Sequence, residues 1–192
     1  FDNNGNIYVT CFTDDVRNLL LLYDTKGKLL RKIFSKSVIP NGGLWNCASL
    51  TVNSKNELIV AYRYLNLIEI YDQAGKFKSS FSIPGLPPKS MPKKIGNNEI
   101  IPADLLIGDV AVDVSNNILL LGGQYSSNSE RDIYVFGEHG QYIAQGVLPE
   151  KSGILTCTKN NILYTRESQR TVIGKYKYEL IKVKSNGNKR FK

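Results

Sequence analysis

Histidine is almost missing from this 192-residue chain, since His139 is its single copy. His139 lies in a turn between two glycines, so a catalytic triad or a histidine-built metal site has almost no material. The three cysteines, Cys11, Cys47 and Cys157, are far apart and lack the close spacings of zinc or redox motifs. We therefore expect small buried thiols rather than a disulfide, and no metal, no cofactor and no catalytic residues.

Long apolar runs are also missing. The longest clusters, residues 19–23 and 118–121, have the length of a strand, far below the roughly 18 apolar residues of a membrane-spanning helix. No stretch longer than a turn combines a helical period with caps. At 42% hydrophobic residues, the chain can still bury a good core. These features predict an all-β globular fold without a transmembrane segment.

Acidic charge is scarce in one region only. The net charge is +8, and residues 166–192 carry nine Lys and Arg against two Glu, or +7. The remaining 16 basic and 15 acidic residues leave residues 1–165 at +1. The basic character is thus a C-terminal feature and implies no chain-wide nucleic-acid footprint. Because Tyr176 and Tyr178 lie among these lysines, RNA binding remains an alternative function.

Two turn signals recur along the chain. The first is a polar Asn or Gly turn that feeds an apolar strand, and it precedes Ile7, Leu58, Ile118 and Ile162, at spacings of 51, 60 and 44 residues. The second is an Asp-x-x-Gly turn, or a variant of it, between two strands. It occurs at residues 24–27, 72–75, 137–140 and 184–187. Periods of this length indicate a repeat array.

The repeated unit has four short antiparallel strands in its second and third copies, where a strand at residues 48–52 or 109–113 precedes the Asn turn. Such units are the signature of β-propeller blades. We predict one domain, 1–192, with four blade units at about residues 1–35, 44–84, 105–149 and 152–192. The first unit lacks an inner strand, so we expect that position to be unfilled or completed by the C-terminal segment. A closed four-bladed ring is the alternative.

Residues 109–113, 116–120 and 133–140 resemble an NHL-type repeat, and residues 2–9 and 71–76 resemble parts of it. The whole chain is similar to NHL and TolB-like six-bladed β-propellers, which include bacterial cell-envelope proteins. The resemblance implies units that belong to, or derive from, a six-bladed ring. It also implies a periplasmic or cell-surface location, with a lipid anchor in an upstream segment as one option, because the chain starts at Phe1 without a leader.

Arginines are concentrated in predicted loops. In propeller geometry, the loops between second and third strands and the links between blades emerge on one face. Five of the seven arginines fall there, with Trp45 and Tyr64 beside them: Arg17, Arg63, Arg131, Arg166 and Arg170. Converging guanidinium groups bind carboxylate or phosphate, so we predict a non-catalytic binding or scaffold propeller that recognises a protein partner or an anionic ligand. The alternative is that each arginine pairs with a neighbouring carboxylate.

Two further features carry alternatives. The link at residues 82–106 contains five prolines with Lys89, Lys93 and Lys94, so it is either a partner-binding arm or a tolerated surface insertion. Hydrolases on six-bladed propellers hold calcium on oxygen ligands, and Asp109 and Glu99 are available for this. No complete ligand set can be placed, so a calcium-dependent propeller hydrolase is the second alternative function.

Overall fold

The computed structural model describes residues 1–10, 20–33, 35, 37, 39, 43–96, 99–158, 160–167, 171–182 and 189–191. Strands dominate this part of the chain, and its only helices are the short 3-10 turns η1 (Gly43–Asn46) and η2 (Ser129–Arg131). The all-β prediction is therefore confirmed. None of the helices among these residues has the length and apolar character needed to cross a membrane.

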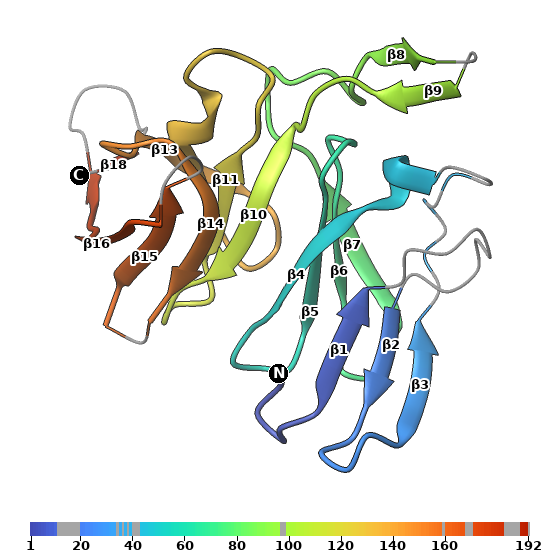
Figure 1. Cartoon of the computed structure of the whole chain (residues 1–192). Helices are drawn as coiled ribbons and strands as arrows, with labels where there is room; N and C mark the ends of the chain where they lie inside the picture. Colours follow the sequence, from blue (N-terminus) through green and yellow to red (C-terminus); the bar gives the residue numbers. More distant parts are fainter. Residues whose placement is uncertain are drawn as a thin grey trace.

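Two of the predicted units form complete four-stranded antiparallel sheets (Figure 1). The second sheet consists of β4 (Ala48–Val52), β5 (Leu58–Tyr62), β6 (Ile68–Tyr71) and β7 (Phe77–Phe81), paired in that order. The third contains β10 (Ile107–Val112), β11 (Ile118–Gly122), β12 (Asp132–Phe136) and β13 (Tyr142–Val147), also paired in order. Chain order and spatial order coincide in both sheets, which is the topology expected of a propeller blade.

The first and fourth units form three-stranded sheets within the described residues. The first contains β1 (Ile7–Thr10), β2 (Leu20–Tyr23) and β3 (Leu29–Ile33), and the fourth contains β14 (Ser152–Cys157), β15 (Ile162–Glu167) and β16 (Ile173–Lys177). No described strand precedes β1 in its sheet, which agrees with the missing inner strand.

Within the described residues, the C-terminal segment does not complete the first sheet, contrary to one of our two expectations. Strands β17 (Leu180–Lys182) and β18 (Lys189–Phe191) form a hairpin, and β18 pairs in parallel with β13. The preceding residue Tyr178 is buried and donates a hydrogen bond to Asp113 of the third unit. This contact holds the chain beside the third sheet, whose outer edge the hairpin then covers.

The sheets pack face to face, and the inner strand β10 of the third sheet lies between the inner strands of its two neighbours. Strand β10 packs against both β4 and β14, and β1 packs against β4 (Figure 1). Apolar side chains fill three layers, one between each pair of successive sheets. The layer between the first two sheets includes Leu20 and Tyr62. The layer between the second and third sheets includes Ile70 and Leu120, and the layer between the third and fourth includes Leu121 and Leu163. A core distributed between blades in this way is the packing of a β-propeller.

The Asn turns join neighbouring blades at one end of the structure. The backbone N–H of Asn3 donates to Asn56 Oδ1 at 2.9 Å, and that of Ser54 donates to Asn116 Oδ1 at 3.0 Å. Asn56 and Asn116 adopt φ of 58° and 62°, a left-handed conformation that asparagine tolerates better than most residues. The recurring Asn turn therefore joins the first blade to the second and the second to the third through one asparagine side chain each, a contact that we call the latch.

The proline-rich link has its own structure. Strands β8 (Pro92–Ile95) and β9 (Glu99–Pro102) form a hairpin that extends from the blade end opposite the Asn turns (Figure 1). Pro92 lies opposite Pro102 in the register of the two strands. The neighbouring pair, Met91 and Ala103, is hydrogen-bonded, since the Ala103 N–H donates to the Met91 carbonyl. Since hydrogen-bonded and non-bonded pairs alternate, both prolines occupy a non-bonded pair and remove no ladder hydrogen bond.

Candidate functional site

Loops between second and third strands meet the links between blades at one end, as predicted. The N–H of Arg63 donates to the Cys47 carbonyl at 2.8 Å, and the Arg63 carbonyl accepts from the N–H of Leu106 at 2.8 Å. The N–H of Ser90 donates to the Tyr64 carbonyl at 2.8 Å. These bonds fix the loop that follows β5 to the links on both sides of it.

A pocket of about 190 Å³ opens at this end between the second, third and fourth sheets. Its polar lining comes from Arg63, Gln124, Glu130, Ser152 and Arg166. Leu105 and four glycines supply the remainder of the wall. The lining combines the end of β5, the segment after β11, η2, the start of β14 and the end of β15, so three blades build the site together.

Arg63 is the most confined cation of the pocket. Its Nε is buried and has no hydrogen-bond partner within the described part of the chain. A buried, unpaired guanidinium N–H costs free energy, because it has left water without a replacement acceptor. The pKa of the neighbouring Cys47 thiol is raised by burial, and the Arg63 charge opposes that rise.

Positive charge is in excess in the pocket. Arg166, next to the end of β15, is exposed and forms no ion pair among the described residues. Glu130 is the one carboxylate in the lining, and the Lys151 Nζ lies 3.8 Å from it. Gln124 Nε2 also donates to Glu130 at 3.2 Å. Lys151 offsets the charge of Glu130, which leaves two arginines facing a small volume.

Glycines give the wall its shape. A Cβ on Gly122 would lie 2.1 Å from the Ser129 carbonyl oxygen, and one on Gly123 would lie 2.2 Å from the Leu105 carbonyl oxygen. Ser129 is fully buried, and its hydroxyl donates to the Gly123 carbonyl at 2.8 Å. Only glycine fits such close backbone approaches. The Gly122–Gly123 pair therefore lets η2 fold back onto β11 and brings Glu130 to the pocket.

The predicted site residues do not all reach this pocket. Arg63 and Arg166 line it together. Arg131 does not, because its Nε donates to the Leu148 carbonyl at 2.7 Å and holds the link to the fourth sheet. Trp45, in η1, packs partly buried against the core between the first two sheets. Tyr64 is half-buried and is held through its backbone carbonyl rather than in the pocket. Arg17 and Arg170 lie outside the described residues.

The sequence interpretation missed Glu130, Gln124 and Ser152. The adjacent glycines at the end of an apolar strand were the available signal, since a paired glycine there indicates close backbone contact.

Residues that suggested RNA binding or a calcium site make structural contacts instead. Tyr178 is buried against Asp113, and Tyr176 packs, partly buried, on the core between the third and fourth sheets, so both rings are used in the packing of the fold. Asp109 Oδ2 accepts the Leu155 N–H at 2.9 Å across two blades. Among the described residues, no three His, Cys, Asp or Glu side chains gather as a metal site would require.

Compared by sequence, the chain matches no family model and no curated protein. By structure it is similar to a streptogramin B lyase (13% identity, 97% of this chain, 72% of that chain, TM-score 0.44) and to virginiamycin B lyase from Staphylococcus aureus (13%, 92%, 67%, 0.44). It is also similar to the dihydro-heme d1 dehydrogenase NirN (10%, 100%, 36%, 0.48), of which it spans about a third. These are β-propeller proteins. At such values the likenesses carry no conclusion about function, and the NHL or TolB-like family stays a prediction.

Proposed function

We propose that this propeller is a binding module that recognises a small anionic group, a carboxylate or phosphate, in the pocket of Arg63 and Arg166. The observation that carries the proposal is the buried Arg63 Nε, which has no partner among the described residues, in a pocket shared with the exposed Arg166. An anion would accept from Arg63 and gain Coulomb attraction from both cations, as bidentate arginine sites do.

The size of the pocket limits the ligand. Sites for drug-sized molecules enclose roughly 300–1,000 Å³, whereas this pocket has about 190 Å³. It therefore fits one charged group with a few further atoms. Such a group can belong to a free metabolite or to an acidic side chain or terminus of a protein partner, and both share the same chemistry at Arg63 and Arg166.

A titration of the full chain with phosphate, acetate and succinate tests the proposal. Isothermal titration calorimetry at low ionic strength should detect at least one of them, and added salt should weaken binding because Arg166 is exposed. Hydrogen bonds to charged groups contribute about 1.5–3 kcal/mol, so Arg166→Ala should weaken binding by roughly 10- to 100-fold. Arg63→Met, which keeps the apolar stem, should do the same.

Arg31→Ala is the matched control, since Arg31 is exposed and lines a different pocket. That variant should bind the anions like the unmodified chain. The proposal is wrong if none of the three anions binds, or if Arg63→Met and Arg166→Ala both bind with unchanged affinity. Circular dichroism of each variant confirms that the fold is retained.

A further inference from the structure

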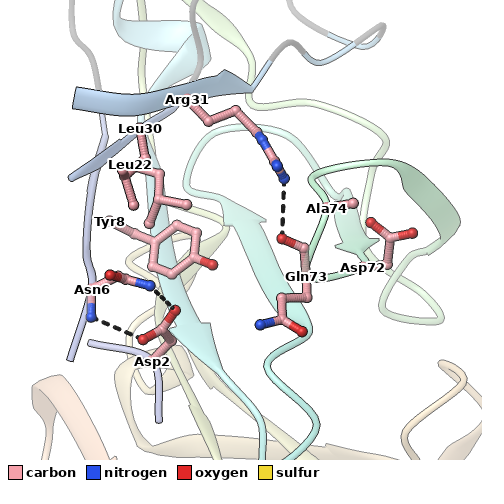
Figure 2. Close-up of a pocket in the computed structure, with 9 residues that line it drawn as sticks. All are labelled: Asp2, Asn6, Tyr8, Leu22, Leu30, Arg31, Asp72, Gln73 and Ala74. Carbon is pink, nitrogen blue, oxygen red and sulfur yellow. Dashed lines mark hydrogen bonds between the residues drawn. The ribbon is translucent and has the colours of Figure 1, made fainter. Parts of the chain in front are cut away.

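A second, larger pocket of about 690 Å³ lies between the first and second sheets. Figure 2 shows its two walls: Tyr8, Leu22 and Leu30 stand on one side, and the turn after β6 with Gln73 stands on the other. The volume lies within the range of small-molecule sites, roughly 300–1,000 Å³. This pocket is at the opposite blade end from Arg63, since turns rather than loops and links enclose it.

One group of polar atoms around the pocket is already satisfied. Asp2 Oδ1 accepts the backbone N–H groups of Asn4 and Asn6, each at 2.9 Å, and its Oδ2 accepts from Asn6 Nδ2 at 2.9 Å. Burial alone would raise the pKa of Asp2, but these hydrogen bonds lower it below its ordinary value. Asp2 is therefore a fixed carboxylate that holds the turn in shape.

Other polar atoms have unused capacity. Within the described residues, the hydroxyl of Tyr8 has no hydrogen-bond partner, although Tyr8 is only 9% exposed. Figure 2 shows this hydroxyl directed toward the wall that carries Gln73. Among the same described residues, the Gln73 side-chain amide has no partner either, and Asp72 uses only Oδ1, which accepts the Lys76 N–H at 2.9 Å. The pocket thus presents a hydroxyl, an amide and a carboxylate oxygen together.

Arg31 spans the pocket. Its Nη1 donates to the Gln73 carbonyl at 3.2 Å across the two sheets, as Figure 2 shows. Its remaining N–H groups have no partner in the described part of the chain. Together with Asp2 and Asp72, Arg31 leaves a formal charge of −1 in the lining. An anion would be repelled by the two carboxylates, so the charge pattern disfavours the kind of ligand expected at Arg63.

The lining matches one class of ligand. The Tyr8 hydroxyl, the Gln73 amide and the Asp72 carboxylate offer hydrogen-bond donors and acceptors. The apolar surface of the lining comes from Leu22, Leu30 and Ala74. A sugar ring has hydroxyls that both donate and accept, together with apolar C–H faces. We propose that this pocket binds a neutral carbohydrate, one or two sugar units long, with its hydroxyls on Tyr8, Gln73 and Asp72 and with Arg31 closing over it. This site is independent of the anion pocket.

Saturation-transfer difference NMR on the full chain tests the proposal with a panel of neutral sugars: glucose, galactose, mannose, N-acetylglucosamine, maltose, cellobiose and lactose. At about 10 mM ligand, weak sites with Kd near 1 mM are detected. At least one sugar should give a signal. Gln73→Ala and Arg31→Ala, both at exposed positions, should each weaken binding by roughly 10-fold through the loss of one or two hydrogen bonds.

Two control variants separate this site from its surroundings. Thr25→Ala changes the same turn position in the first sheet, outside the pocket, and Arg166→Ala changes the anion pocket; both should bind sugar normally. The proposal is overturned if no sugar of the panel gives a signal. It is also overturned if Gln73→Ala and Arg31→Ala both bind as tightly as the unmodified chain, or if the pocket takes simple amines or anions in preference to sugars.

Discussion

Replacing Tyr71 by Phe should destabilise the protein by about 2 kcal/mol, because it removes one hydrogen bond to a buried carboxylate. Glu69 is only 1% exposed and has no cationic partner among the described residues. Its Oε2 instead accepts from the hydroxyls of Tyr71 (2.6 Å), Tyr62 (2.9 Å) and Ser35 (2.7 Å), and its Oε1 accepts from Ser37 (2.6 Å). Four hydroxyls thus replace water around one negative charge.

The size of the effect follows from the contacts that remain. A hydrogen bond to a charged group contributes about 1.5–3 kcal/mol. In Tyr71→Phe, three hydrogen-bond donors still contact Glu69. The variant therefore avoids the larger loss of stability that an unpaired buried charge would cause. The ring of Tyr71 packs edge-on against Phe77 at 6.0 Å between centroids, a contact that Phe preserves.

Equilibrium urea unfolding measures this change. With an m value of about 3 kcal/mol/M, a loss of 2 kcal/mol lowers the midpoint by about 0.7 M urea. Tyr142→Phe is the control: Tyr142 is exposed, and no described group accepts from its hydroxyl, so its midpoint should not move. In a Glu69→Gln background the bond becomes neutral, and Tyr71→Phe should then cost about 1 kcal/mol less. A loss below about 0.5 kcal/mol, or equal losses in both backgrounds, would refute the reasoning.

Three further predictions concern the latch, the glycine wall and alkaline pH. Asn116→Ala should cost about 2–3 kcal/mol in urea unfolding, since φ of 62° strains Ala and the bond from Ser54 is lost; Asn116→Gly should cost only about 1 kcal/mol. Gly122→Ala should cost about 3 kcal/mol or prevent folding, seen by circular dichroism, because its Cβ meets the Ser129 carbonyl. Burial and Asp113 raise the pKa of Tyr178 above the ordinary 10.0, so folded chains keep a proton that unfolded chains lose. The contribution of Tyr178 to the free energy of unfolding is therefore fully present below about pH 10 and decreases above it. In urea unfolding series between about pH 9 and pH 11, Tyr178→Phe should make the free energy of unfolding decrease less with pH.

The fold was predictable from the sequence because turn chemistry repeats. A positive φ at Gly27 and Gly75 is compatible with few residues, so the Asp-x-x-Gly signal specifies a turn even where the strands vary. The hairpin of β8 and β9 was not predicted, because proline normally excludes a strand. Only the register, which places Pro92 opposite Pro102, makes this hairpin compatible with both prolines.

The candidate site was predictable only in part. Loop position placed Arg63 and Arg166 at the correct end, since their strands end there. Side-chain direction was not readable: Arg131 is in an equivalent loop, yet its Nε is occupied by a backbone carbonyl 17 residues away. The sugar pocket gave no sequence signal at all, because Tyr8 and Gln73 belong to different blades and meet only through the packing of two sheets.

Departures from the repeat have structural consequences at the joints between blades. Asn3 and Ser54 each donate to the asparagine of the next blade, Asn56 and Asn116. Asn161 occupies the same turn position in the fourth sheet and also has a positive φ, of 55°. Its Oδ1 is nevertheless buried without a partner within the described residues. The third joint therefore lacks the latch that the first two share.

Other contacts hold that joint. Asp109 Oδ2 accepts the Leu155 N–H of the fourth sheet at 2.9 Å, and Asp113 accepts from the hydroxyl of Tyr178, just after that sheet, so two carboxylates of the third unit bind the fourth unit. Hydrogen bonds to carboxylates are stronger than those to an amide oxygen, which offsets the unsatisfied oxygen of Asn161. Charged acceptors therefore replace the asparagine side chain at this joint, while the Asn161 carbonyl still accepts the N–H of Tyr178 at 3.2 Å and helps to position it. The side-chain oxygen of the fourth Asn turn is not used to join the third and fourth sheets, which explains how the sequence of that turn can diverge from the other three.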